Sequence, residues 1–269
     1  MNLSSRDWLN SLQEQAKASD LEHLDILIDA TGLDYPLLKQ LAELEPRPLQ
    51  ALLFDGTPEH DLAEQGPVLI RLLWAQPEQV NWLGGLLKQL HGQSRVLALL
   101  SRWPFEPLTE HLRYCTQAQW NNGAISGVLR YYDTRLFKHI SGLFVGDDNR
   151  DLHAPVITWH WIDRDQRAQI IGGAQLKLYE YTKPTSPLML DDRQMQSIYA
   201  RGQAEQWEAN HGPIQQSYPM GKEQLIAQVH IGQLAANSQR LEGEERRAFM
   251  VEWLAEHLPA TVSSTSGLA

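Results

Sequence analysis

The sequence predicts an α/β fold, with α+β as the alternative, in which a mixed sheet covered by helices is followed by a smaller helical lobe. Short apolar runs alternate with helix-periodic segments over the first two-thirds of the 269 residues, a pattern typical of sheets with helical cover. The stretch 183–190 (KPTSPLML) then breaks this pattern and indicates a linker. We therefore expect an α/β lobe over 1–183, a helical lobe over 188–259 and a disordered tail over 260–269.

The N-terminal lobe begins with a short amphipathic helix. Ser5 precedes an apolar face made of Trp8, Leu9, Leu12 and Ala16. After it, apolar β-branched runs predict strands and helix-periodic stretches predict helices. The predicted strands are 23–29, 48–54, 67–73, 95–101 and 125–131. The predicted helices are 35–44, 78–90, 107–117 and 134–143.

The pattern changes after residue 145. A polar loop leads to 156–162 (VITWHWI), which alternates like a half-exposed strand and can close a hairpin onto 167–171. Three helices are predicted beyond the linker, at 192–209, 222–239 and 243–258. In the last of them an apolar stripe recurs at helical spacing and predicts packing against the other helices. Its members are Phe249, Met250, Trp253, Leu254 and Leu258.

Composition excludes several classes of protein. A formal net charge of −10 argues against nucleic-acid binding, which needs a concentrated basic face. The only cysteine, Cys115, cannot form an intramolecular disulfide and fits a reducing compartment. No apolar run approaches the roughly 18 residues that span a bilayer, and the first residues do not resemble a signal peptide. We expect a cytoplasmic protein that binds neither membrane nor nucleic acid.

The ten histidines show no spacing typical of a metal site. His153 and His160 come nearest to a cluster, with Asp151 and Asp163 close in sequence. Histidines in a turn and on a strand surface are the favoured interpretation. No metal is therefore expected.

Motifs for nucleophilic or cofactor chemistry are equally weak. Cys115 lies four residues after His111 and can share its helix face, but a packed thiol beside a structural histidine is favoured over a nucleophile–base pair. The sequence contains no GxSxG elbow, P-loop or GxGxxG. Asp25 and Asp29 fall on one side of a strand, yet Asp29 more naturally ends that strand. We expect no cofactor and no enzyme activity.

The most informative stretch is 125–144, where an apolar run leads directly into a helix-periodic segment. Asp133 is well placed as the N-cap of that helix. Arg130 and Arg135 bracket its carboxylate. Such a junction carries either an internal clamp or a binding site.

Nine tryptophans are present, and aromatic side chains with a polar group are common in protein-binding patches. Trp159 and Trp161 point to the same face of their predicted strand, with His160 opposite. One side of this strand is therefore a candidate docking surface.

Five short motifs occur in a fixed order along the chain. They are LIDAT at 27–31, LLFDGT at 52–57, GPVLIRL at 66–72, TEHLRY at 109–114 and VLRYYDTRLF at 128–137. Together they resemble the type VI secretion effector chaperones, or effector adaptors, a family once catalogued only as a domain of unknown function. The resemblance covers residues 24–145, and the helical C-terminal part is in keeping with it. Thr134 departs from the family pattern, which often has proline there, although threonine can occupy a first helical turn.

The resemblance implies binding and not catalysis. Such adaptors hold a cognate toxic effector, usually encoded nearby, and help deliver it onto the tip of the VgrG spike. The matching polar and junction residues imply an Arg–carboxylate network that organises the junction or contacts the partner, and the organising role is favoured. These residues are Asp29, His111, Arg113, Arg130, Tyr131, Asp133 and Arg135.

Two other interpretations stay open on the sequence. A small α/β hydrolase or transferase would use His111 and Asp133 as acid and base, in a concave polar site. A structural component of the secretion machine would instead assemble with copies of itself.

Overall fold

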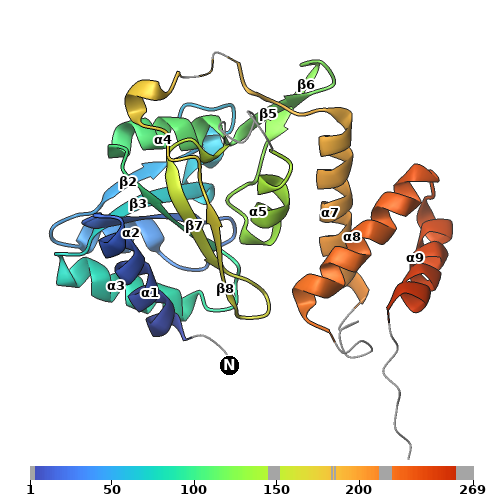
Figure 1. Ribbon diagram of the computed structural model, residues 1–269, viewed down its shortest axis with the longest axis horizontal. Coiled ribbons are helices and arrows are strands. Elements are labelled where there is room, and N and C mark those ends of the chain that lie inside the picture. Colours follow the sequence, from blue (N-terminus) through green and yellow to red (C-terminus); the bar gives the residue numbers. More distant parts are fainter. Residues whose placement is uncertain (1–3, 145–151, 183, 185, 212–219, 259–269) are drawn as a thin grey trace, which may run out of the picture. The chain divides into compact units, whose positions relative to one another are not determined.

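The structure is a computed structural model that describes residues 4–144, 152–182, 184, 186–211 and 220–258. It divides into two compact units, Met1–Leu190 and Asp191–Ala269 (Figure 1). No helix of the described residues is long and apolar enough to cross a membrane. The tail predicted to be disordered lies outside the described residues.

A six-stranded antiparallel sheet forms the frame of the first unit. Its strand order is β2-β3-β1-β4-β7-β8, and every neighbouring pair is antiparallel. The predicted fold class is confirmed, although this main sheet is antiparallel and not mixed. The strands are β1 (His23–Asp29), β2 (Leu49–Leu52), β3 (Pro67–Leu73), β4 (Val96–Ser101), β7 (Val156–Ile162) and β8 (Ala168–Gly172).

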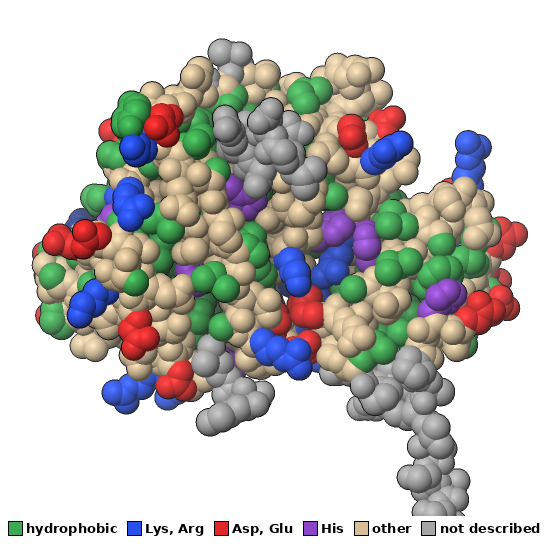
Figure 2. Space-filling model, in the orientation of Figure 1, with side chains coloured by type: hydrophobic (Ala, Val, Ile, Leu, Met, Phe, Trp, Pro, Cys, Tyr) green, Lys and Arg blue, Asp and Glu red, His purple; other side chains and the backbone are tan. Residues whose placement is uncertain are grey.

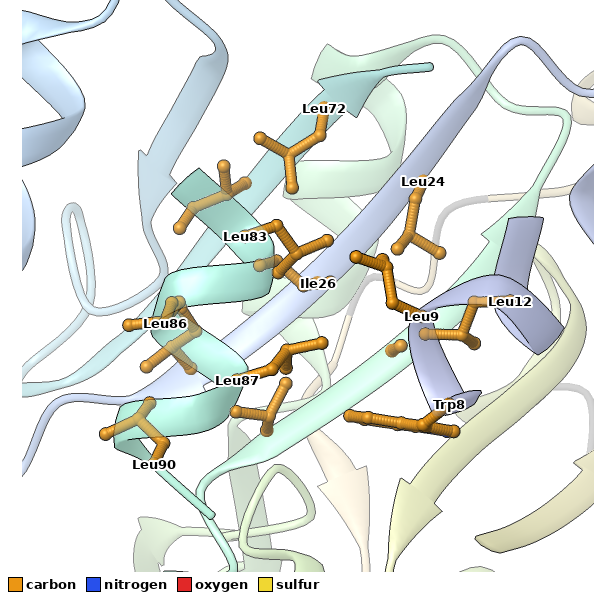
Figure 3. Packing of buried hydrophobic residues seen from close by; sticks show 14 of the residues in the cluster. Trp8, Leu9, Leu12, Leu24, Ile26, Leu72, Leu83, Leu86, Leu87 and Leu90 are labelled. Carbon is orange, nitrogen blue, oxygen red and sulfur yellow. The ribbon is translucent and has the colours of Figure 1, made fainter. Parts of the chain in front are cut away.

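One face of this sheet packs against α1 (Ser5–Ala18), α2 (Leu37–Glu43) and α3 (Pro77–Gln89). Because side chains alternate along a strand, every second residue of β1 points into this core (Figure 3). Burying each large apolar side chain stabilises the fold by roughly 1.5–3 kcal/mol. The fully buried members include Leu12, Leu24, Ile26, Ile28, Leu83 and Leu86.

The opposite face carries the polar residues of β1 and a set of aromatic residues. Asp25 pairs with Arg71 on β3 and with Leu99 on β4, and Leu99 pairs with Trp159 on β7. Residues paired across antiparallel strands share a face, so these four form one row. Helix α5 (Thr134–Ser141) contacts this face through Phe137, whose ring centroid lies 5.0 Å from that of Trp159.

A small second sheet, ordered β6-β5-β9, follows α4 (Phe105–Tyr114). Its strands are β5 (Gln117–Trp120), β6 (Ile125–Val128) and β9 (Leu188–Met189). Strand β5 was not predicted from the sequence, and its first residue fell at the end of a predicted helix. Asn121, Asn122 and Gly123 turn the chain with φ angles of 52°, 53° and 82°, the left-handed conformation that tight hairpin turns need. The pairing of β5 with β9 is parallel, so this sheet is mixed.

The second unit contains α7 (Asp192–His211), α8 (Lys222–Ser238) and α9 (Gly243–His257) (Figure 1). The predicted stripe of α9 supplies buried Met250 and Leu254, with Phe249 and Trp253 partly buried beside them. Gly232 lets α8 and α9 approach closely, because a Cβ atom there would lie 2.7 Å from Trp253 Cδ1. The unit is therefore held mainly by apolar packing between helices.

Two short 3₁₀ helices complete the described elements of the first unit, η1 (His60–Gln65) and η3 (Leu178–Glu180). Charged side chains of both signs are interspersed on the face drawn in Figure 2.

Candidate functional site

The junction that leads into α5 is built around the Asp133 side chain. Asp133 is the N-cap residue, and its Oδ1 accepts a hydrogen bond from the Arg135 backbone N–H at 3.1 Å. An N-cap satisfies a first-turn donor that has no partner within the helix. The predicted cap is thus confirmed, and it fixes a carboxylate that is only 2% exposed.

Two arginines bind this carboxylate from different sides. Arg135 forms a bidentate pair with Asp133, with Nε 2.9 Å from Oδ1 and Nη2 2.7 Å from Oδ2. Arg130 Nη2 lies 3.6 Å from Asp133 Oδ2 and donates to Asp29 Oδ2 at 2.8 Å. Arg130 therefore joins the end of β1 to the start of α5. The structure brings these four predicted residues together.

Further contacts hold the same end of the sheet. Asp29 Oδ1 accepts a hydrogen bond from the Thr31 N–H at 3.1 Å. Arg95 Nη1 donates to the carbonyl oxygens of Asp29 and Thr31, at 2.9 and 2.8 Å. The Arg130 guanidinium carbon lies 5.9 Å from the centroid of the Tyr132 ring, and burial raises the pKa of the Tyr132 hydroxyl. The junction is thus a connected polar network and not a set of separate pairs.

Tyr131 and the two tryptophans of β7 are core residues. The Tyr131 side chain is fully buried, and its hydroxyl donates to the Leu112 carbonyl oxygen at 3.0 Å. Trp159 and Trp161 are 0% and 2% exposed and contact Phe137 of α5. The prediction that these tryptophans form a docking surface is wrong. Their shared face was predicted correctly, but α5 covers it.

His111 belongs to a second cluster, on α4. Its Nδ1 lies 2.9 Å from the Tyr181 hydroxyl, and its Nε2 lies 3.5 Å from Cys115 Sγ. The ring also makes an edge contact with Trp103, at 5.7 Å between centroids. The contact between Cys115 and His111 follows from their spacing on one helix, as the sequence predicts, although Cys115 itself is the cap residue just after α4.

A cavity of about 220 Å³ opens beside His111 and is bordered by Trp103, Glu110 and Tyr181. The described contacts of His111 include Tyr181, Cys115, Trp103 and Tyr114, whereas the described ion pairs of Asp133 are with Arg130 and Arg135. A general acid and a general base must both lie within hydrogen-bond reach of the same bound substrate. In the described part of the chain, the contacts of the two residues that a hydrolase would need have no member in common.

Arg113, two residues further along α4, joins neither cluster. Its Nη2 donates a long hydrogen bond of 3.5 Å to the Leu52 carbonyl oxygen. The side chain borders a cavity of about 310 Å³ beside the turn after β2. The residues of the predicted polar signature therefore separate into three places.

The sequence interpretation missed a fourth polar group, at the centre of the sheet. Arg71 Nε and Nη2 bind the two oxygens of Asp25 at 2.7 and 2.8 Å, and Nη2 also donates to the Trp103 carbonyl oxygen at 2.9 Å. Arg71 is the one charged residue of PVLIRLL, and Asp25 lies in the interior of HLDILID, which ends in a second aspartate. Opposite charges within two apolar strands that can pair are the sequence feature from which this ion pair could have been predicted.

No group of three or more metal-ligating side chains occurs among the described residues. His153 and His160, predicted in a turn and on a strand surface, are instead 1% and 2% exposed. Trp159 Nε1 donates to His153 Nδ1 at 2.8 Å, so that nitrogen is an acceptor and the ring is neutral. Burial lowers the pKa of each histidine to about 4. Asp151 lies outside the described residues.

Of three comparisons with known proteins, only the comparison with protein-family models gives a match. The search of curated proteins and the search of solved structures return none. Residues 26–144 match the family model described as Domain of unknown function (DUF4123), which is associated with type VI secretion effector adaptors. The matched region runs from β1 to the end of the α5 segment, so it includes Asp29, Arg113, the junction network and most of the main sheet.

Proposed function

We propose that this protein is an adaptor that binds a cognate toxic effector of a type VI secretion system and loads it onto the VgrG spike. The observation that carries the proposal is the match of residues 26–144 to a domain associated with such adaptors. That region has the resemblance motifs at its two ends, in β1 and at the start of α5.

The polar residues of the matched region support a binding role. Asp29, Asp133 and their arginines neutralise one another in a connected network, and Arg71 and Asp25 do the same inside the sheet. Paired groups of this kind fix the backbone around them, and a preformed surface binds a partner with less loss of conformational entropy. The network therefore fits a rigid frame that presents loops and helix faces to another protein.

The proposal is tested by producing the protein together with the product of the neighbouring gene, which the resemblance implies is the effector. We expect both proteins to elute as one complex in size-exclusion chromatography and the effector to lose solubility when the adaptor is absent. Purified VgrG should then capture the effector only when the adaptor is present.

Two results would contradict the proposal. One is failure of the effector and the adaptor to associate under these conditions. The other is turnover of a small substrate that is lost in His111→Gln or Asp133→Asn while the variant remains folded.

A further inference from the structure

The cavity that Arg113 borders is the strongest candidate for a ligand site outside the junction network. It has a volume of about 310 Å³ and lies between the turn after β2 and the start of β5. Its lining includes Thr57, Pro58, Glu110, Arg113, Tyr114 and Gln117. The space is sufficient for one amino-acid side chain together with a few water molecules.

Arg113 differs from the three arginines of the ion pairs described above in that it binds no carboxylate among the described residues. Arg71, Arg130 and Arg135 each bind a carboxylate at 2.7–2.8 Å. Arg113 is half-buried, its Nε is buried without a hydrogen-bond partner, and its contact with the Leu52 carbonyl is 3.5 Å long. Among the described residues no Asp or Glu forms an ion pair with it. A buried donor on a cation is costly when it is unpaired, so an anion entering this cavity would be favoured.

Glu110 is the acidic residue of the lining, and a second acidic residue, Glu59, is bound to two other residues of the lining. Glu59 Oε2 accepts hydrogen bonds from the Thr57 hydroxyl at 3.0 Å and from Gln117 Nε2 at 2.8 Å. These contacts hold Thr57 and Gln117, which line the same cavity as Arg113, in place. The guanidinium is thereby left as the charged donor of the cavity, and its planar geometry matches a carboxylate.

We infer that Arg113 receives the carboxylate of a glutamate or aspartate side chain from the effector. This inference rests on the proposed function for the identity of the partner, whereas the recognition of a carboxylate rests on the cavity alone. The pairing gives the guanidinium a carboxylate partner, which it has with none of the described residues.

Carboxylate recognition is tested on the full-length protein by following the Arg113 Nε–H resonance during NMR titration. The probes are N-acetyl-glutamate N-methylamide, its glutamine analogue, N-acetyl-alanine and inorganic phosphate. We expect a saturable shift with the glutamate probe and none with the glutamine analogue. A stronger response to N-acetyl-alanine or to phosphate would overturn the assignment to a side-chain carboxylate, as would the absence of any response.

Variants separate the role of the charge from that of the fold. Arg113→Gln should remove the response, and Arg113→Lys should retain a weaker one, because lysine keeps the charge without the planar fork. Glu110→Gln removes a negative charge from the lining and should tighten binding of the glutamate probe by about two- to fivefold. Weaker binding by Glu110→Gln would mean that the cavity accepts cations, which contradicts the inference.

The effector complex then tests the role of the cavity in the partner interface. Arg113→Gln should weaken effector binding about tenfold or more, while Arg102→Gln should not. Arg102 is a suitable control because it is exposed and donates only to the Ser19 carbonyl oxygen among the described residues. Equal binding by Arg113→Gln and the parent would overturn the inference alone, whereas absence of binding by the parent would overturn the proposed function.

Discussion

Strand β1 carries two Asp–Arg pairs four residues apart, and they differ sharply in exposure. Asp25 and Arg71, in the middle of the sheet, have side chains that are 0% and 9% exposed. At the end of the strand Asp29 is 7% exposed, but its partner Arg130 is 40% exposed. The same two residue types therefore form a sealed pair at one position and a half-solvated pair at the other.

The difference determines what each pair can do. Burial raises the pKa of Asp25, and the hydrogen bonds from Arg71 oppose that rise. Such a pair adds little net stability over apolar residues, yet loss of one partner leaves an uncompensated charge. The arginines of the junction can be hydrated by water when a partner is lost, so that network tolerates change and can also meet another molecule. The buried pair of Asp25 and Arg71 has a structural role. The half-solvated pair of Asp29 and Arg130 belongs to the junction network, part of which is exposed to solvent.

Removal of the carboxylate of the sealed pair should have the largest effect. In Asp25→Asn the charge of Arg71 remains buried without a counter-charge, so we expect the free energy of unfolding to fall by about 3–5 kcal/mol. Urea unfolding followed by circular dichroism measures this. A loss below about 1 kcal/mol would mean that water reaches Arg71 and that the two pairs do not differ as described.

The double variant Asp25→Leu/Arg71→Met is the matched control for this prediction. It replaces both charges by apolar side chains and should recover most of the stability that Asp25→Asn loses. Continued instability of the double variant would show that packing and not charge causes the loss.

Acidification should produce the next largest effect, because it adds charge to buried groups that have no acidic partner in their described contacts. The pKa of His153 and of His160 is lowered from 6.5 to about 4 in the folded protein. Between these values the unfolded chain binds more protons, so stability falls as the pH falls from 6.5 to about 4. Each histidine should account for about 3 kcal/mol of this loss over the full interval.

Unfolding of the parent, His153→Gln and His91→Gln at several pH values measures this contribution. His153→Gln should flatten the dependence on pH, and His91→Gln, at an exposed position, is the control for the substitution itself. An equal slope in His153→Gln and the parent would show that this histidine does not titrate as its burial requires.

A smaller effect is expected at the junction. Asp133→Ala removes both the N-cap of α5 and the carboxylate of two arginines, and should cost about 1–2 kcal/mol. Asp133→Asn keeps a cap oxygen but not the charge, so it should recover about half of this loss in the same unfolding assay. If Asp133→Ala proves as costly as Asp25→Asn, the junction is as dependent on its charges as the core.

The smallest effect concerns the response of the pairs to salt. Raising the ionic strength from about 0.1 M to about 1 M shortens the screening length from about 10 Å to about 3 Å. Double-mutant cycles should then show a coupling between Arg135 and Asp133 that falls by a few tenths of a kcal/mol, while the coupling between Arg71 and Asp25 stays constant. Equal salt sensitivity would remove the distinction between the pairs.

The elements of the fold follow largely from local sequence pattern. Strands β1, β3 and β7 begin and end where the apolar runs predict, because a buried strand needs continuous apolar residues bounded by turn residues. The N-cap at Asp133 also follows from local chemistry. Strand β5 was missed because its four residues, QAQW, have no clear period, and only the Asn-Asn-Gly turn after them indicates a hairpin.

The sequence by itself determined most of the helices and strands, the polar junction and the shared face of Trp159 and Trp161. Only the tertiary structure decided that α5 covers those tryptophans, that Asp25 meets Arg71, and that Arg113 lies apart from the junction beside a cavity. The physical reason is that hydrogen bonding and periodicity act over a few residues, whereas burial and charge pairing depend on residues distant in sequence. Asp29 and Arg130, 101 positions apart, are joined only when the sheet has formed.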